Sequence, residues 1–446
     1  MNVRAKNIAV LGLGRSGESA ARFLRDRGAA VTLLDSGVGE GIERKATELS
    51  KAGFNVIIGT SALNASGVFD YAIISPGIDA GELFVRQFSD RGIPVIGELE
   101  LAFAFNDLPV IAITGTNGKT TTTELVAAML NSVGVETVAC GNIGLPFTEV
   151  VHTPPGELDV ITLEVSSFQL ETIRTFRPKV ALWLNLTPDH LDRYPGMEEY
   201  RAAKLRIFEN QGSTDFAVVN AQDDLPPLAA KKITFSAFAQ NADFTLRDGV
   251  IYHLGKRVAA VSSFHLSGVH NIENLMAALG VAVAMDIPVA EVLPALQAYR
   301  PAPHRCELVA TVDGVDYIND SKATNVDALA KALNSQGSPV VLIAGGKDKG
   351  FRYADLTGLV GTKVKSAILI GEMADRIRED WQGTVACEVA VSLADAVARA
   401  RKAAAPGDVV LFSPGTSSFD MFRDYADRGN QFRQLANNLL TKEQAQ

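Results

Sequence analysis

The sequence contains few cysteines, no long hydrophobic run and no excess of basic charge. The three cysteines lie far apart among the 446 residues, at positions 140, 306 and 387, which argues against a disulfide framework or a zinc cluster. No stretch approaches the roughly 18 consecutive apolar residues of a membrane-spanning helix, so we expect no membrane span. Because the net charge is −9, we do not expect non-specific binding to nucleic acid.

The sequence also lacks internal repeats, low-complexity tracts and a secretion signal. The first residues, MNVRAKNIAVLGLG, lead directly into a predicted strand and contain no small-residue cleavage site. Together with the sparse cysteines, this predicts a cytoplasmic protein. A hydrophobic content of 47% with 21% charged residues is ordinary for a globular chain. The length of 446 residues is enough for roughly two to four domains.

The strongest motif is a glycine-rich turn between a predicted strand and a predicted helix. Residues 110–113 form a short apolar run, which is typical of a buried parallel strand. The turn and the first helical residues that follow are Gly115, Thr116, Asn117, Gly118, Lys119, Thr120 and Thr121. Glycines let backbone N–H groups approach phosphates, and a helix N-terminus attracts negative charge. Lys119 would reach the terminal phosphates and the Thr120 hydroxyl would face Mg²⁺, so the pattern predicts a nucleoside triphosphate site.

This turn is tighter than the common phosphate-binding loop. Ile113 stands where the usual spacing places a glycine, five residues before the Gly-Lys pair. A Gly-rich turn that arose by chance is the alternative interpretation. The order of strand, turn and helix favours the phosphate site.

A second glycine pattern opens the chain. Gly12, Gly14 and Gly17 follow a predicted strand at 6–11, and Asp35 ends the next predicted strand. This is the dinucleotide-binding fingerprint, which predicts a diphosphate at the helix N-terminus. The pattern leaves open whether the ligand is NAD, FAD or a nucleotide sugar. Alone it would suggest an oxidoreductase, but the second phosphate site downstream argues for another function.

Polar residues follow the predicted strands of the central region. Glu164 ends one strand, and Asp189 and His190 follow the next. Because the carboxyl ends of parallel strands share one edge, we expect these residues beside the phosphate loop. His190 could be a capped loop histidine, but its position favours contact with a metal or substrate. Lys204 lies in a predicted helix at 197–210, where spacing alone favours a solvated side chain.

A third α/β region follows a boundary near residue 300, which four prolines mark: Pro288, Pro294, Pro301 and Pro303. Before that boundary, Asn271 and Asn274 share one face of a predicted helix. After it, Lys322 and Lys349 stand in loops that follow predicted strands, as does the hydroxyl-rich segment 413–418. Both lysines could be solvated loop residues. Their convergence with hydroxyls would suit an anionic substrate, and the whole arrangement favours an ATP-dependent ligase over a hydride-transfer enzyme.

Seven segments resemble, in chain order, motifs of the Mur ligase family. They are GTNGKTT (115–121), LEVSSFQLE (163–171), NLTPDHLDRY (185–194), HNIENLMAAL (270–279), HRCE (304–307), NDSKATN (319–325) and SPGTSSFDMFRDYADRG (413–429). The resemblance covers essentially the whole chain. It implies an α/β fold of three domains: a Rossmann-like UDP-sugar-binding domain at 1–99, a central P-loop ATPase-type domain at 100–301, and a Rossmann-like amino-acid-binding domain at 302–446.

Within the family the motifs most resemble the branch that adds D-glutamate to UDP-N-acetylmuramoyl-L-alanine in cytoplasmic peptidoglycan precursor synthesis. The resemblance implies that ATP phosphorylates the substrate carboxylate and that the amine of D-glutamate attacks the acyl phosphate. Amide, ADP and phosphate are the products. No side-chain nucleophile is needed, so catalysis would rest on positioning and charge neutralisation. We expect a monomer whose partners are these small molecules.

The resemblance also assigns roles by motif match. ATP would contact residues 115–121 and Asn271, Asn274, Arg305 and Asp320. The catalytic set is Lys119, Glu164, His190 and Lys204. Two Mg²⁺ ions would be held by Thr120, Glu164, His190 and Lys204, the lysine being carbamylated. The UDP-sugar would contact Arg15, Ser16, Asp35, Ser36, Ser75, Gly77, Asn142 and His190. D-Glutamate would contact Lys322, Thr324, Lys349, Ser418 and Tyr425.

Rival functions leave part of these patterns unexplained. An oxidoreductase would have no use for Lys119, Glu164 and His190. A non-catalytic nucleotide-binding regulator would keep the glycines but not the metal-binding set. Among sister ligases, the diaminopimelate- or lysine-adding branch carries an Asp-Asn-Pro-Arg motif that this sequence lacks. Folylpolyglutamate synthase lacks the N-terminal nucleotide domain, and the alanine-adding branch differs in the segment aligned with 413–422.

Overall fold

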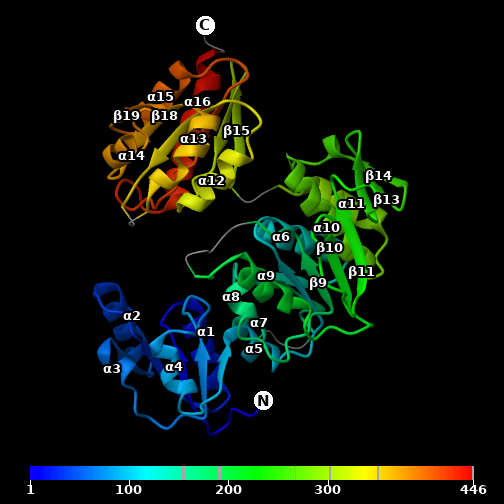
Figure 1. Cartoon of the computed structure of the whole chain (residues 1–446), viewed down its shortest axis with the longest axis vertical. Helices are drawn as coiled ribbons and strands as arrows, with labels where there is room; N and C mark the ends of the chain where they lie inside the picture. The colour runs from blue at the N-terminus through cyan, green and yellow to red at the C-terminus, as the bar shows by residue number, and fades with distance from the viewer. Residues whose placement is uncertain (153–155, 188–192, 267, 301–302, 349–350, 444–446) are drawn as a thin grey trace. The chain divides into compact units, whose positions relative to one another are not determined.

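The computed structural model describes residues 1–446 except 153–155, 188–192, 267, 301–302, 349–350 and 444–446 (Figure 1). The chain divides into two compact units, Met1–Tyr299 and Arg300–Gln446. Within the described residues, no helix combines the length and the apolar character that crossing a membrane requires.

The first unit begins with a five-stranded parallel sheet in the order β3-β2-β1-β4-β5. The strands are β1 (Asn7–Leu11), β2 (Ala30–Asp35), β3 (Asn55–Ile58), β4 (Tyr71–Ile74) and β5 (Val95–Gly97). The helices are α1 (Arg15–Asp26), α2 (Glu40–Lys51), α3 (Thr60–Leu63), α4 (Leu83–Ser89) and α5 (Glu98–Phe103). The strand order reverses at β1, whose neighbours are β2 and β4. In such sheets a ligand binds beyond the carboxyl ends of the strands at the reversal.

The first unit continues with a nine-stranded sheet in the order β14-β13-β12-β11-β10-β9-β6-β8-β7. Its strands are β6 (Val110–Thr114), β7 (Thr137–Gly141), β8 (Val160–Glu164), β9 (Val180–Trp183), β10 (Phe216–Asn220), β11 (Lys231–Ser236), β12 (Phe244–Arg247), β13 (Val250–His253) and β14 (Lys256–Ala260). The β12–β13 and β13–β14 pairs are antiparallel, and the other pairs are parallel. Strands β12 to β14 are therefore an antiparallel extension of a parallel sheet.

Helices cover both faces of this sheet because its central strands are apolar on both sides, as parallel strands require. One core combines the sheet with α6 (Lys119–Ser132), α10 (Val269–Ala284) and α11 (Val289–Ala298). The opposite core includes residues of α5, α7 (Phe147–Val150) and α8 (Ser167–Leu170). Since α5 also follows β5 directly, it links the smaller sheet to the larger one.

Two details differ from expectation. The predicted helix at 197–210 is an α-helix only over α9 (Met197–Leu205), followed by a 3₁₀ turn, η1 (Arg206–Phe208). Pro294 does not mark a boundary, because it lies inside α11. A proline inside a helix removes one backbone hydrogen bond. Burial of Val292 and Leu296 in the core keeps α11 helical despite this loss.

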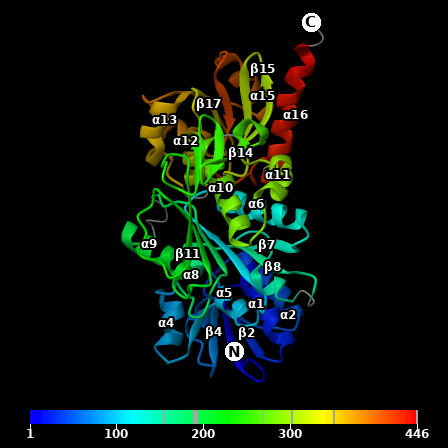
Figure 2. The same cartoon turned by 90° about the vertical axis from the view of Figure 1, so that its right-hand side faces the viewer.

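The second unit contains a six-stranded sheet in the order β15-β16-β20-β17-β18-β19. Its strands are β15 (Glu307–Val312), β16 (Val315–Asn319), β17 (Val340–Gly345), β18 (Val364–Ile370), β19 (Ala386–Val389) and β20 (Val409–Phe412). Only the β15–β16 pair among these is antiparallel. The unit's α-helices are α12 (Val326–Asn334), α13 (Thr357–Lys363), α14 (Ala374–Asp380), α15 (Leu393–Ala403) and α16 (Tyr425–Glu443). Helices α12 and α13 lie on the face of the sheet opposite α16 (Figure 2).

Candidate functional site

The glycine-rich turn predicted from the sequence joins β6 to α6. Gly118 has a φ of +81°, in the left-handed region that favours glycine. A Cβ atom at Gly118 would lie 2.2 Å from Oδ1 of Asn274 on α10. The turn therefore requires glycine for two reasons, its backbone conformation and the close approach of α10.

The segment after β9 holds this turn in place. The Asn117 N–H donates to Oδ1 of Asn185 (2.9 Å), and Nδ2 of Asn185 donates back to the Asn117 carbonyl (3.1 Å). Oγ1 of Thr116 donates to the Thr187 carbonyl (3.1 Å) and accepts the Thr187 N–H (3.0 Å). The phosphate loop is thus fixed by side-chain and backbone hydrogen bonds before any ligand is considered.

Two lysine ammonium groups converge on one carbonyl of the loop. Nζ of Lys119 donates to the carbonyls of Gly115 and Thr116, at 2.9 Å each. Nζ of Lys204 donates to the same Gly115 carbonyl at 2.8 Å and lies 4.7 Å from the ring centroid of Tyr200. Lys204 is only 1% exposed. The expectation of a solvated Lys204 is therefore wrong, because the buried face of α9 that includes Tyr200 and Lys204 packs toward the loop.

Glu164 ends β8 beside Ile113 of β6. Its Oε1 accepts a hydrogen bond from Nδ2 of Asn142 (2.8 Å), which follows β7. Its Oε2 is buried, and no donor among the described residues reaches it. A buried carboxylate oxygen without a donor is costly unless a cation compensates it, and oxygen is the ligand that Mg²⁺ prefers. The site chemistry therefore fits a divalent cation at Glu164.

Of the other residues in the predicted metal set, Thr120 and Lys204 lie within the described residues and His190 does not. Thr120 stands in the first turn of α6. His190 falls in the segment 188–192, which lies outside the described residues. No cluster of three or more His, Cys, Asp or Glu side chains that could hold a metal occurs within the described ranges.

On α10, Nδ2 of Asn274 donates to Oδ1 of Asn271 (3.2 Å), which confirms the prediction that the two asparagines share one face of a helix.

The N-terminal fingerprint forms a second loop, between β1 and α1. A Cβ atom at Gly17 would lie 2.0 Å from the carbonyl oxygen of Gly12, so the helix packs tightly on the turn. Asp35 braces this region: Oδ2 accepts the Leu13 N–H (3.0 Å) and Oδ1 accepts the Gly37 N–H (2.8 Å). The sequence predicted Asp35 as a ligand contact, and these loop hydrogen bonds were not foreseen.

The remaining N-terminal candidates lie at the same carboxyl edge of the sheet. Arg15 and Ser16 open α1, and Arg15 is exposed, 3.9 Å from Glu149 in a weak ion pair. Ser36 follows β2, and Gly77 lies in the turn after β4. Oγ of Ser75 in that turn is buried without a hydrogen-bond partner among the described residues. This edge of the sheet therefore carries serine hydroxyl groups and the N-terminus of α1, which could bind a diphosphate.

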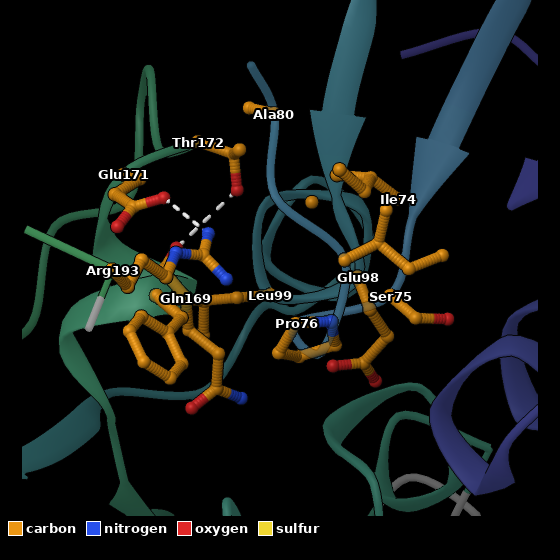
Figure 3. A pocket seen from close by; sticks show the side chains of 13 residues that line it. Ile74, Ser75, Pro76, Ala80, Glu98, Leu99, Gln169, Glu171, Thr172 and Arg193 are labelled. Atoms are coloured by element: carbon orange, nitrogen blue, oxygen red, sulfur yellow. Dashed lines mark hydrogen bonds and ion pairs between the residues drawn. The ribbon is translucent and has the colours of Figure 1, made fainter. Parts of the chain in front are cut away.

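A small cleft of about 10 Å³ lies between this turn and the central part of the first unit. It is lined on one side by Ser75 and Pro76, and on the other by Gln169, Glu171 and Arg193 (Figure 3). Figure 3 shows the Arg193 side chain directed toward Glu171 and Thr172. Sequence reasoning did not single out Arg193, although it is part of the motif NLTPDHLDRY.

In the second unit, the predicted nucleotide contacts Asp320 and Arg305 lie at the edge of the sheet where β16 and β20 end. Asp320 follows β16, and its Oδ2 accepts a hydrogen bond from Oγ of Ser413 (2.8 Å), which follows the adjacent strand β20. Its Oδ1 accepts the Cys306 N–H (3.1 Å). Burial raises the pKa of Asp320 to about 6. Nε of Arg305 is buried without a hydrogen-bond partner among the described residues.

The predicted D-glutamate contacts lie on loops of the same unit. Nζ of Lys322 lies 5.4 Å from the ring centroid of Tyr425, at the start of α16. Ser418 is buried, and its carbonyl accepts the Phe422 N–H (2.9 Å). Thr324 is half-buried between β16 and α12, and Lys349 lies outside the described residues. The structure thus brings Lys322 and Tyr425 together.

Arg428 is a buried residue that sequence reasoning missed. Its guanidinium donates to Oγ and the carbonyl of Ser321 (3.0 and 2.8 Å) and to the carbonyl of Thr416 (3.1 Å). It therefore ties the loop after β16 to the loop after β20, and burial lowers its pKa to about 10. The sequence spacing could have indicated this burial, because Arg428 lies four and eight residues before Phe432 and Ala436, on the same buried face of the helix.

Comparison with protein-family models matches three consecutive parts of the chain. Residues 6–97 match the model described as Mur ligase MurD-like, N-terminal domain. Residues 113–282 match the Mur ligase middle domain, and residues 304–415 match the Mur ligase, glutamate ligase domain.

Full-length relatives and solved structures agree with these matches. The chain is 41% identical over 453 residues to the UDP-N-acetylmuramoylalanine--D-glutamate ligase of Geobacter metallireducens, covering 99% of this chain and 100% of that protein. It is 42% identical over 450 residues to the enzyme of that name from Geotalea uraniireducens, covering 98% and 99%. The fold resembles that of MurF ligase from Thermotoga maritima in complex with ADP, with a TM-score of 0.57, 14% identity and coverage of 99% and 96%.

Proposed function

The chain belongs to the Mur ligase family, and from that membership we propose that it joins D-glutamate to UDP-N-acetylmuramoyl-L-alanine at the expense of ATP. The observation that carries this proposal is the 41% identity to a D-glutamate ligase over 99% of the chain. The substrate is a nucleotide sugar, which fits the glycine-rich loop between β1 and α1. The reaction belongs to peptidoglycan precursor synthesis, and its use of ATP fits a cytoplasmic location.

The chemistry proceeds in two steps. The terminal carboxylate of UDP-N-acetylmuramoyl-L-alanine attacks the γ-phosphorus of ATP, which gives an acyl phosphate and ADP. The amine of D-glutamate then adds to the acyl carbon, the tetrahedral adduct loses phosphate, and the nitrogen loses a proton to give the amide. The negative charge that develops in each step lies on oxygen, so fixed cations and N–H donors can stabilise it without a protein nucleophile.

The loop between β6 and α6 is proposed to hold the triphosphate. Residues 119–121 form the first turn of α6, whose N–H groups can bind phosphate oxygens. Nζ of Lys119 donates to the carbonyls of Gly115 and Thr116, which places this cation at the loop. Asn271 and Asn274 are presented to the loop by α10, as the close approach of Asn274 to Gly118 supports. Arg305 and Asp320 of the second unit are proposed to bind the rest of the nucleotide.

Two Mg²⁺ ions are proposed to neutralise charge on the phosphate oxygens. Thr120 would hold one of them, and Glu164, His190 and carbamylated Lys204 the other. The buried Oε2 of Glu164, which no described donor reaches, supports this assignment.

Carbamylation of Lys204 is supported by its surroundings. Nζ of Lys204 is buried and shares the Gly115 carbonyl with the ammonium of Lys119. The neutral form of the amine is the one that adds carbon dioxide. The addition of carbon dioxide to the neutral amine forms an N–C bond and releases one proton, and the product is a carboxylate-like anion. The carboxylate-like group can coordinate a metal ion, whereas an ammonium group cannot.

The other substrate contacts are proposed on the same motif matches. The UDP-sugar would be held by Arg15, Ser16, Asp35, Ser36, Ser75, Gly77, Asn142 and His190. D-Glutamate would be held by Lys322, Thr324, Lys349, Ser418 and Tyr425, whose cations and hydroxyls suit its two carboxylates. The proposed domains are 1–99, 100–301 and 302–446, and the proposed active form is a monomer.

Phosphate release from ATP tests the function. The purified protein is given UDP-N-acetylmuramoyl-L-alanine and one amino acid at a time. We expect release with D-glutamate and none with L-glutamate, L-alanine or diaminopimelate. Release with a different amino acid would assign the chain to a sister activity, and no release with any of them would refute the ligase proposal.

A further inference from the structure

The two parts of the first unit meet closely along one edge of the cleft in Figure 3. A Cβ atom at Gly97, the last residue of β5, would lie 2.2 Å from Oγ1 of Thr172. Nη2 of Arg174 donates to the carbonyl of Val95 (3.1 Å). The ends of the N-terminal strands are therefore packed against the segment that follows α8.

Arg193 connects both sides of this edge. Its Nη2 donates to Oε2 of Glu171 (2.7 Å), and its guanidinium carbon lies 4.1 Å from the ring centroid of Phe168. Its Nε lies 3.6 Å from Oδ2 of Asp79, in the turn after β4. The side chain is only 13% exposed. One guanidinium thus pairs with a carboxylate from each part of the unit.

The turn that Arg193 reaches includes the proposed sugar-nucleotide contacts. Oδ1 of Asp79 accepts the Gly81 N–H (2.7 Å), while the Ile78 N–H donates to the carbonyl of Ser75 (3.1 Å). The turn from Ser75 to Gly81 is therefore internally bonded, and Asp79 is the residue through which Arg193 can hold it. A shift of Asp79 would move Ser75 and Gly77 with it.

We propose that Arg193 is a positioning residue that holds the sugar-nucleotide turn against the ATP-binding part of the chain. This inference rests on the proposed function. Arginine suits the task because its planar fork can pair with Glu171 and Asp79 at once, whereas a lysine ammonium is a single point charge. Arg193 also stands three residues after His190 in the chain, so one motif would contribute to both the proposed metal set and the turn.

The test compares three variants with wild type: Arg193→Gln, Arg193→Lys and Asp79→Asn. The matched control is Arg177→Gln, which removes an ion pair of the same unit, to Asp215 (2.7 Å), away from the turn. Binding of UDP-N-acetylmuramoyl-L-alanine is measured by calorimetry, and kcat and each KM by phosphate release. Thermal melting checks that each variant is folded.

We expect Arg193→Gln to weaken binding of the sugar nucleotide and raise its KM about tenfold, and Asp79→Asn to do so about threefold. Arg193→Lys should restore part of the loss. The KM for ATP and the properties of Arg177→Gln should stay within about twofold of wild type.

Two results would overturn the inference: unchanged sugar-nucleotide binding in the folded Arg193→Gln and Asp79→Asn variants, or an equal loss in Arg177→Gln. If wild type itself fails to bind the sugar nucleotide, the proposed function fails instead, so the two failures are distinct.

Discussion

The proposed ATP loop of the first unit and the strand-end loops of the second unit reach a fixed shape by different means. Between β6 and α6, glycines allow the backbone shape, with Gly118 in the left-handed region against Asn274. Hydrogen bonds to Asn185 and Thr187 hold that shape. In the second unit, a buried guanidinium, Arg428, binds the loops after β16 and β20. In the proposed phosphate loop, the glycine backbone leaves room for N–H groups around a ligand. In the second unit, hydrogen bonds from one buried side chain hold two separate loops together.

Removal of the loop's cation is the largest expected change. Lys119→Met should lower kcat/KM about 100- to 1,000-fold, because a fixed positive charge on the phosphates is lost. Lys232→Met, at an exposed lysine of β11, is the control and should leave the rate unchanged. Steady-state phosphate release measures both. Equal rates for Lys119→Met and wild type would remove Lys119 from the site.

Substitution of Arg428, whose hydrogen bonds join the two loops, should have the largest effect on stability. Arg428→Lys cannot make the bonds to Ser321 and Thr416 at once, so we expect the unfolding free energy to fall by roughly 2–4 kcal/mol. Arg423→Lys alters an exposed arginine just before α16 and should cost less than about 0.5 kcal/mol. Urea denaturation compares the two. An unchanged midpoint for Arg428→Lys would show that the loops are held by other contacts.

The second unit also carries a pH-sensitive carboxyl group. Because the folded pKa of Asp320 is raised to about 6 from an ordinary 3.8, its unfolded form loses a proton first as the pH rises. The wild type therefore loses stability between about pH 4 and pH 6, by roughly 1–3 kcal/mol, relative to a residue that does not titrate. The unfolding free energy of Asp320→Asn, measured by urea denaturation, should therefore rise relative to that of wild type as the pH increases from about 4 to about 6. A constant difference from pH 4 to pH 7 would contradict the raised pKa.

Glycine substitutions should give the smallest effects and separate shape from charge. Gly118→Ala places a Cβ against Asn274 in a left-handed backbone, and we expect a loss of about 1–2 kcal/mol with weaker ATP binding. Gly14→Ala, where no atom lies within 4 Å of the added Cβ and φ is −67°, should cost about 0.5 kcal/mol or less. Thermal melting and nucleotide titration test the pair. Similar losses at both positions would refute the steric argument.

Much of the first unit could be predicted because its elements follow local patterns. The apolar runs before Gly12 and Gly115 form β1 and β6, and helices follow both turns. Helical spacing alone wrongly predicted a solvated Lys204, since it cannot tell which partner a helix face meets, and only the family resemblance assigned this residue to the site. Pro294 misled for a similar reason: its local preference is outweighed by burial of the helix around it.

The sequence alone determined the two glycine turns, the family resemblance and the polar residues at strand ends, because each depends on neighbours in the chain. Only the tertiary structure decided that Lys204 shares a carbonyl with Lys119, that Arg428 ties two loops, and that Arg193 pairs with both Glu171 and Asp79. These contacts join residues far apart in sequence. The physical reason is that burial and ion pairing depend on which surfaces meet, and no local pattern encodes that.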